Sequence, residues 1–134
     1  MGLSKDDILK ASDLPVEELH IPQWGGIVYV KAMTGKERDA FEADSLERKE
    51  NSTTKTSELA DLRARLAVVT LVDEDGRPMF DNTQESINLL SAKSASALDL
   101  IFDLASRLNG FSQADVEELA GNLESAPVES STSA

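Results

Sequence analysis

The stretch IPQWGGIVYVKAMTGKERDAF, residues 21–41, places strand signals directly before a helix signal. Gly25-Gly26 separates two apolar runs, and the second run is rich in the β-branched and aromatic residues that favour strands. A glycine pair between such runs predicts a type I′ hairpin turn, in which both central residues have a positive φ. Thr34 and Glu37 then have the spacing of a capping box, which marks a helix start. We therefore expect a hairpin at about residues 16–33, with antiparallel strands and a helix following directly.

The lysine in this stretch also raises the possibility of a nucleotide-binding loop, which the spacing excludes. The phosphate-binding pattern requires a glycine five residues before its Gly-Lys pair, and a serine or threonine after the lysine. Val30 and Glu37 occupy those two positions. The Thr-Gly-Lys-Glu sequence is therefore interpreted as a helix cap.

Outside this stretch, turn and cap signals divide the chain into helices. Near the start, Ser4 and Asp7 have capping-box spacing, and Leu3 and Ile8 stand where a hydrophobic staple would place them. The segment 51–57, NSTTKTS, is predicted to be a flexible loop. The expected helices span residues 5–11, 36–50, 57–72, 82–90, 91–108 and 112–123.

The helix at 91–108 is the clearest of these, because its polar residues form one narrow stripe and the remainder is mostly apolar. This pattern indicates a central core helix. Asn109-Gly110 ends it as a left-handed cap would, and Ser112 with Asp115 opens the next helix. The polar stripe consists of Ser96, Asp99, Asp103 and Ser106.

These elements predict an α+β fold that is predominantly helical, with an N-terminal hairpin followed by a bundle of about four to five helices. A chain of 134 residues is long enough for one domain to bury roughly 65 to 70% of its unfolded surface. We expect residues 1–123 to form that single domain. Residues 124–134 are small, polar and acidic, which is typical of a disordered tail.

Composition narrows the classes of function. The chain has no cysteine, so disulfides and thiolate metal sites are excluded. Its formal charge of -12, from 25 acidic and 13 basic side chains, repels nucleic acids and anionic lipids. We therefore expect neither nucleic-acid nor membrane partners. The start has charges where a signal peptide needs apolar residues, which favours a cytoplasmic protein.

Catalytic and metal chemistry have few candidate residues. His20 is the single histidine and lies in a predicted edge strand, so a solvated side chain is the better interpretation. Asp73, Asp75 and Gly76 match part of a calcium loop, but the closing glutamate is absent and an ordinary turn is favoured. The sequence therefore predicts no catalytic, cofactor or metal site, and a protein that is not an enzyme.

Three segments between Trp24 and Leu119 follow a recognisable order: WGGIVYVKAMTGKERDAFEA, RARLAVVTLVDEDGRPMF and SALDLIFDLASRLNGFSQADVEEL. Together they resemble the tail assembly chaperones of long-tailed bacteriophages. The resemblance implies a non-enzymatic protein of the host bacterial cytoplasm that binds the tape-measure protein and is absent from the mature virion. It also implies a frameshift-extended form of the same chain as a partner, and tail tube subunits are a further candidate partner.

A chaperone for coiled-coil-forming helices would offer an apolar groove with a charged rim, because helix-in-groove binding uses anchors at helical spacing. The candidates are Leu59, Leu62, Leu66, Ile101, Leu104 and Leu108, and the favoured alternative for all six is packing in the protein's own core. The acidic C-terminal half could steer a basic client region towards them. Two other functions remain open: a structural virion protein of the tail or head-to-tail connector, and an acidic inhibitor that mimics nucleic acid.

Overall fold

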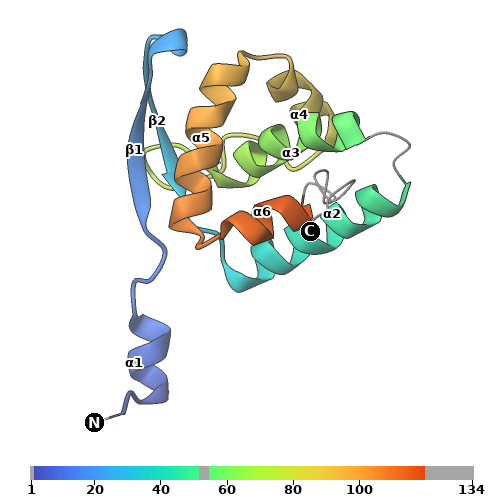
Figure 1. The fold of residues 1–134 in the computed structure, drawn as a ribbon. Helices are drawn as coiled ribbons and strands as arrows, with labels where there is room; N and C mark the ends of the chain where they lie inside the picture. Colours follow the sequence, from blue (N-terminus) through green and yellow to red (C-terminus); the bar gives the residue numbers. More distant parts are fainter. Residues whose placement is uncertain (1, 52–54, 120–134) are drawn as a thin grey trace, which may run out of the picture.

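The computed structural model describes residues 2–51 and 55–119 (Figure 1), and within them the side chains of residues 49, 51, 55–60 and 119 are left out. The fold is α+β and 58% helical, which confirms the predicted class. Three strands form one antiparallel sheet in the order β1-β2-β3. The elements are α1 (Lys5–Lys10), β1 (Val16–Ile21), β2 (Gly26–Lys31), α2 (Gly35–Asn51), α3 (Lys55–Thr70), β3 (Leu71–Val72), α4 (Gln84–Ser91), α5 (Ala95–Leu108) and α6 (Gln113–Leu119).

The hairpin forms where the sequence predicts it, but its turn is different. β1 and β2 pair antiparallel, and Ile21 lies opposite Gly26 at the turn end. A 3₁₀ turn at Pro22–Trp24 leads into Gly25, whose φ of 76° is left-handed, while Gly26 already belongs to β2. The predicted two-residue type I′ turn is therefore wrong. Pro22 fixes φ near the value that a 3₁₀ turn needs, so the chain reverses earlier and requires one glycine.

A third strand, which the sequence does not predict, completes the sheet. α3 ends at Thr70, and Leu71 and Val72 then pair with Val30 and Tyr29 of β2. The prediction of a helix through Val72 is wrong at its last two residues. The apolar run LAVVTLV suits a buried helix end and a buried strand equally well, so only pairing with β2 decides between them.

The starts of α1, α2 and α6 follow the predicted caps, whereas α4 and α5 begin later than expected. In α2, Glu37 N–H donates to Thr34 Oγ1 at 3.0 Å, and Thr34 N–H donates to Glu37 Oε1 at 2.9 Å. Matching reciprocal pairs open α1 and α6. The N-cap of α4 is Thr83, so this helix begins at Gln84 and not at residue 82, and the N-cap of α5 is Ser94, so that helix begins at Ala95 and not at residue 91.

The predicted loop at 51–57 is shorter in the structure than expected. Asn51 still belongs to α2, and residues 55–57 already belong to α3. The predictions for residues 52–54, for the end of the last helix at Leu123 and for the 124–134 tail lie outside the described residues.

The pH dependence of stability should show the contribution of the cap at α2. Partial burial acts to raise the pKa of Glu37, but hydrogen bonds from Lys31 Nζ and from the Thr34 N–H outweigh it, so the pKa lies below the ordinary 4.5. This stabilisation is fully present above pH 4.5 and is lost as the pH falls through the lowered folded-state pKa. Urea denaturation across this range should show Glu37→Gln to be less pH-sensitive than the wild type.

At neutral pH the same substitution should cost only about 0.5 kcal/mol, because the Glu37 side chain is 36% exposed and solvent screens its pair with Lys31. Glu47→Gln, at an exposed position of the same helix, is the matched control. Equal pH profiles for the Glu37→Gln variant and the wild type would contradict the prediction.

The core lies between the sheet and the two helices α3 and α5 (Figure 1). α5 packs against α3 and against both long strands, and Ser96, Asp99 and Asp103 of its polar stripe are exposed, whereas the hydroxyl of Ser106 is buried. This agrees with a central core helix. The largest fully buried side chains are Ile21, Val30, Leu62, Leu66, Val68, Thr70, Leu71, Val72 and Ile101.

Candidate partner-binding surface

The predicted partner-binding residues are mostly core residues. Leu62, Leu66, Ile101 and Leu104 are at most 5% exposed and belong to one hydrophobic cluster. Leu108 is partly buried at the edge of that cluster, and the Leu59 side chain lies outside the described residues. The structure thus brings four of the six together, but in the core. A partner could reach them only if α3 and α5 separated.

The exposed apolar surface gathers instead at the N-terminus. Nine large apolar side chains are exposed in the part of the chain that the structure describes, and six of them lie within residues 3–27. Four belong to residues 2–15, which we call the N-terminal arm. Their exposed fractions are 74% for Leu3, 58% for Ile8, 71% for Leu9 and 43% for Leu14.

The arm extends away from the body of the domain (Figure 1). Its helix α1 has six residues and buries none of its side chains. Helices this short are marginal in water, so the local cap is its main support. Ser4 N–H donates to the Asp7 carboxylate, which lowers the pKa of Asp7, and Asp7 N–H donates to Ser4 Oγ.

Packing onto a partner would therefore stabilise the arm. The hydrophobic staple that the sequence predicts between Leu3 and Ile8 does not bury either side chain.

The outer face of the hairpin continues this apolar surface. Residues directly opposite in the two strands point to the same face, so the pairs 16/31, 18/29 and 20/27 share the face away from the core. Val16 is 47% exposed and Ile27 is 48% exposed, and Glu18 and His20 lie exposed between them. His20 is thus a solvent-facing strand residue, as the sequence suggests.

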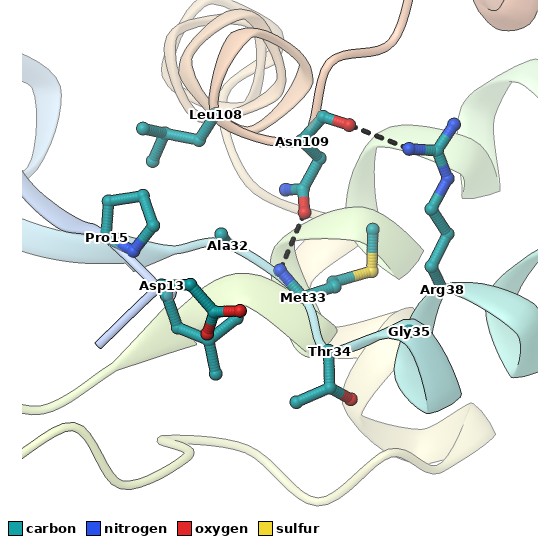
Figure 2. A pocket seen from close by; sticks show the side chains of 10 residues that line it. Asp13, Pro15, Ala32, Met33, Thr34, Gly35, Arg38, Leu108 and Asn109 are labelled. Atoms are coloured by element: carbon teal, nitrogen blue, oxygen red, sulfur yellow. Dashed lines mark hydrogen bonds between the residues drawn. The ribbon is translucent and has the colours of Figure 1, made fainter. Parts of the chain in front are cut away.

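A pocket of about 390 Å³ lies where the arm joins the body (Figure 2). Asn109 organises it: its Oδ1 accepts a hydrogen bond from Met33 N–H at 2.6 Å, and its Nδ2 donates to Ala105 O at 2.8 Å. Arg38 Nη1 donates to the Asn109 carbonyl at 2.8 Å. These bonds tie the end of α5 to the connection between β2 and α2. Asn109 and Arg38 thus bond to groups of the protein itself, which indicates that the pocket is a structural junction.

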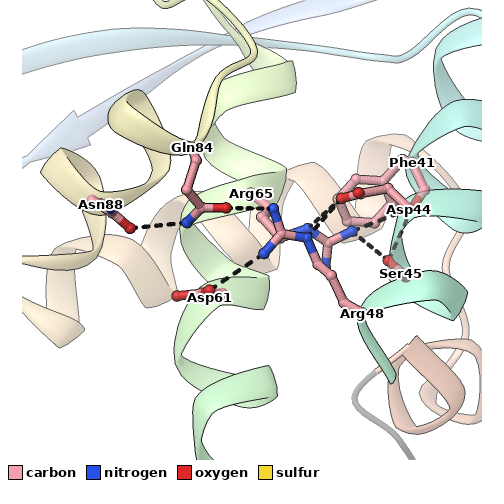
Figure 3. Close-up of polar contacts among 8 residues, drawn as sticks. All are labelled: Phe41, Asp44, Ser45, Arg48, Asp61, Arg65, Gln84 and Asn88. Carbon is pink, nitrogen blue, oxygen red and sulfur yellow. Dashed lines mark hydrogen bonds and ion pairs between the residues drawn. The ribbon is translucent and has the colours of Figure 1, made fainter. Parts of the chain in front are cut away.

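A buried arginine, which the sequence analysis misses, joins α2 to α3 (Figure 3). Arg65 is 4% exposed, and its guanidinium donates to Asp44 Oδ2 at 3.1 Å and to Ser45 Oγ at 2.6 Å. It also lies 4.7 Å from the centre of the Phe41 ring. Burial lowers the pKa of Arg65, and the Asp44 carboxylate opposes that shift. These hydrogen bonds and the ring contact all reach residues of α2, which indicates a structural role.

Two other pockets have no catalytic arrangement of residues. One of about 420 Å³ borders the Arg65 site, and one of about 430 Å³ is lined mainly by apolar side chains, including Trp24 and Met79. Within residues 2–51 and 55–119 no three His, Asp or Glu side chains come close enough to hold a metal ion. In the same part of the chain no helix combines the length and the apolar character that crossing a membrane requires.

The arm and the outer face of the hairpin are therefore the best candidate for a partner-binding surface. A sequence signal for the arm exists in Leu3, Ile8 and Leu9, but only the structure shows that the body leaves them uncovered. Comparison of this chain with protein-family models, with curated proteins and with solved structures finds no match.

Proposed function

We propose that this protein is a tail assembly chaperone of a long-tailed bacteriophage, which binds the tape-measure protein and has no enzymatic activity. The ordered resemblance of three segments supports this proposal. In the structure those segments form β2 with the start of α2, the end of α3 with β3 and its following turn, and α5 with α6. They thus include most of the body of the domain.

The observation that carries the proposal furthest is the exposed apolar arm. A tape-measure protein is long and helical, and its apolar helix faces need cover before the tail assembles. Ile8 and Leu9 present apolar side chains on a short helix that the body does not cover, and exposed Leu3 directly precedes its N-cap. A helical client is bound through the apolar face that it presents, and the exposed side chains of the arm offer an apolar surface for that face. The arm is the part of the described chain best suited to such a contact.

The charge of the protein fits the same role. With a net charge of -12, a chaperone bound to its client would keep the complex soluble by mutual repulsion, and it would favour basic client segments. The proposal places the protein in the host bacterial cytoplasm and outside the mature virion. Its further partners would be a frameshift-extended form of the same chain and tail tube subunits.

Co-expression tests the proposal directly. The chain is produced together with the tape-measure gene of the same genome, and the soluble fraction and co-purification of the tape-measure protein are measured. We expect the tape-measure protein to be soluble and bound only when this chain is present. Absence of an interaction with every segment of the tape-measure protein would refute the proposal. Detection of this chain in purified particles by mass spectrometry would instead favour a virion protein.

Substitutions in the arm should separate binding from folding. The triple variant Leu3→Ser, Ile8→Ser, Leu9→Ser removes apolar side chains that pack on nothing in the domain, so its melting temperature should stay within about 2 °C of the wild type. Its yield of bound tape-measure protein should fall at least about tenfold, since each lost anchor weakens binding.

The matched control for the arm variant is Leu46→Ser with Leu89→Ser, which removes leucines that are 57% and 60% exposed on α2 and α4. This control should bind as the wild type does. Equal loss of binding in both variants would show that the arm has no special role, while the co-expression result would still stand.

A further inference from the structure

The two edges of the sheet differ in whether their outward-facing backbone N–H and C=O groups form hydrogen bonds with the rest of the described chain. At the β3 edge, Met79 N–H donates to the Leu71 carbonyl at 3.2 Å and Asp73 N–H donates to the Arg77 carbonyl at 2.8 Å. Val72 also forms a bridge to Pro78. The chain itself therefore covers this edge. At the opposite edge, Figure 1 shows no element of the described chain beyond β1.

The register determines which backbone groups of β1 are free. Ala32 N–H donates to the Pro15 carbonyl at 2.9 Å, so the pair 15/32 is a hydrogen-bonded one. Hydrogen-bonded and non-hydrogen-bonded pairs alternate along an antiparallel ladder. Residues 17, 19 and 21 therefore bond to β2, and the N–H and C=O groups of Val16, Glu18 and His20 point away from the sheet. These three side chains are also exposed.

Pairing of this edge with a second copy of itself is disfavoured. An antiparallel pair centred on β1 would place Glu18 directly opposite the Glu18 of the other copy, and like charges in that position are destabilising. If the register between the two copies moves by one step towards the N-terminus of β1, Glu17 lies opposite the Glu17 of the other copy. A step of the register towards the C-terminus of β1 makes Pro22 part of the strand pair, and Pro22 has no N–H to donate. The edge is thus open to a strand but protected against self-association.

We infer that β1 binds an extended segment of another protein as an added antiparallel strand, and that this segment carries a lysine or arginine opposite Glu18. Backbone hydrogen bonds to Val16, Glu18 and His20 supply the affinity, as in other cases of strand addition. The charge of Glu18 supplies the preference for lysine or arginine at the facing position, because opposite charges directly across a strand pair are favourable. This site goes beyond the proposed function and does not depend on it.

A synthetic peptide tests the inference without knowledge of the natural partner. The probe is the blocked peptide TVTKTVT, whose lysine lies opposite Glu18 when its two valines lie opposite Val16 and His20. Titration into the isotopically labelled full chain, followed by NMR, should give saturable shifts at β1. Amide hydrogen exchange of Val16, Glu18 and His20 should slow at least about tenfold at saturation, while exchange of Leu19 and Ile21 should stay unchanged.

Three matched peptides separate the contribution of the backbone hydrogen bonds from that of the charge. The peptide TVTETVT should bind roughly tenfold more weakly to the wild type. Glu18→Lys, at an exposed position, should reverse that preference. N-methylation of TVTKTVT at its second, fourth and sixth residues removes the N–H groups that face β1 and should abolish binding, whereas N-methylation at the third and fifth residues should preserve it.

Three results would overturn the inference. One is the absence of saturable shifts at β1 with millimolar TVTKTVT. Another is equal affinity for the lysine and glutamate peptides. The third is slowed exchange at Val16, Glu18 and His20 that depends on protein concentration alone, which would indicate pairing between two copies of this chain.

Discussion

Replacing Ile101 by alanine should lower the free energy of unfolding by about 4 kcal/mol. Ile101 lies in the middle of α5, is 0% exposed and packs in the core cluster with Leu66 and Leu104. Removing three carbon atoms there loses their transfer free energy and leaves a cavity between α3 and α5. The change is measured by urea denaturation followed by circular dichroism, with the slope of the transition checked for two-state behaviour.

Leu89→Ala is the matched control for Ile101→Ala. Leu89 is 60% exposed on α4, so its truncation should change stability by less than about 0.5 kcal/mol. The comparison also decides between the two roles considered for Ile101. If Ile101→Ala weakened tape-measure binding while changing stability by less than about 1 kcal/mol, Ile101 would be a partner-binding residue and its assignment to the core would be wrong.

Features that depend on neighbouring residues can be predicted from this sequence. The capping pairs at Ser4, Thr34 and Ser112 each place a hydroxyl three residues before a carboxylate, and each begins a helix in the structure. Gly110, with a φ of 70°, follows the end of α5 as its position after Asn109 predicts. The energy of these caps is local, so their signal does not require knowledge of the fold.

Features that depend on distant residues cannot be predicted in this way. Leu71 and Val72 become a strand only because β2 offers a free edge some forty residues earlier in the chain. The type of the hairpin turn also escapes prediction, since Pro22 and the glycine pair support different turns and strand register selects one of them. In each case two local patterns are both acceptable and tertiary pairing determines the outcome.

The candidate site shows the same limit. Periodic leucines identify the buried face of a helix, but the pattern is the same whether the protein's own core or a partner buries that face. Leu62, Leu66, Ile101 and Leu104 prove to be core residues. The arm has a weaker pattern, and its exposure depends on where the rest of the chain packs. No local signal distinguishes an apolar side chain that finds a core from one that does not.

Arg65→Ala should be the second most destabilising of these substitutions, with an expected loss of about 3 kcal/mol. The guanidinium of Arg65 is almost fully buried and donates hydrogen bonds to groups of α2 at 3.1 and 2.6 Å. α2 contributes few buried apolar side chains, chiefly Phe41, so polar bonds hold much of its contact with α3. The effect should remain moderate because Asp44 is 46% exposed and keeps its bond to Arg48.

Arg48→Ala provides the control, since Arg48 contacts the same Asp44 carboxylate at 2.9 Å from a position that is 28% exposed. It should cost less than about 1 kcal/mol, as expected for pairs that water can reach. Hydrogen exchange adds a local measurement: in Arg65→Ala the amides of α2 should exchange faster than those of α5. If both arginine variants had equal, small effects, the position of α2 would depend on Phe41 packing and on contacts such as that of Arg38 with Asn109. The buried arginine would then specify where α2 lies without adding net stability, a balance known for buried charges.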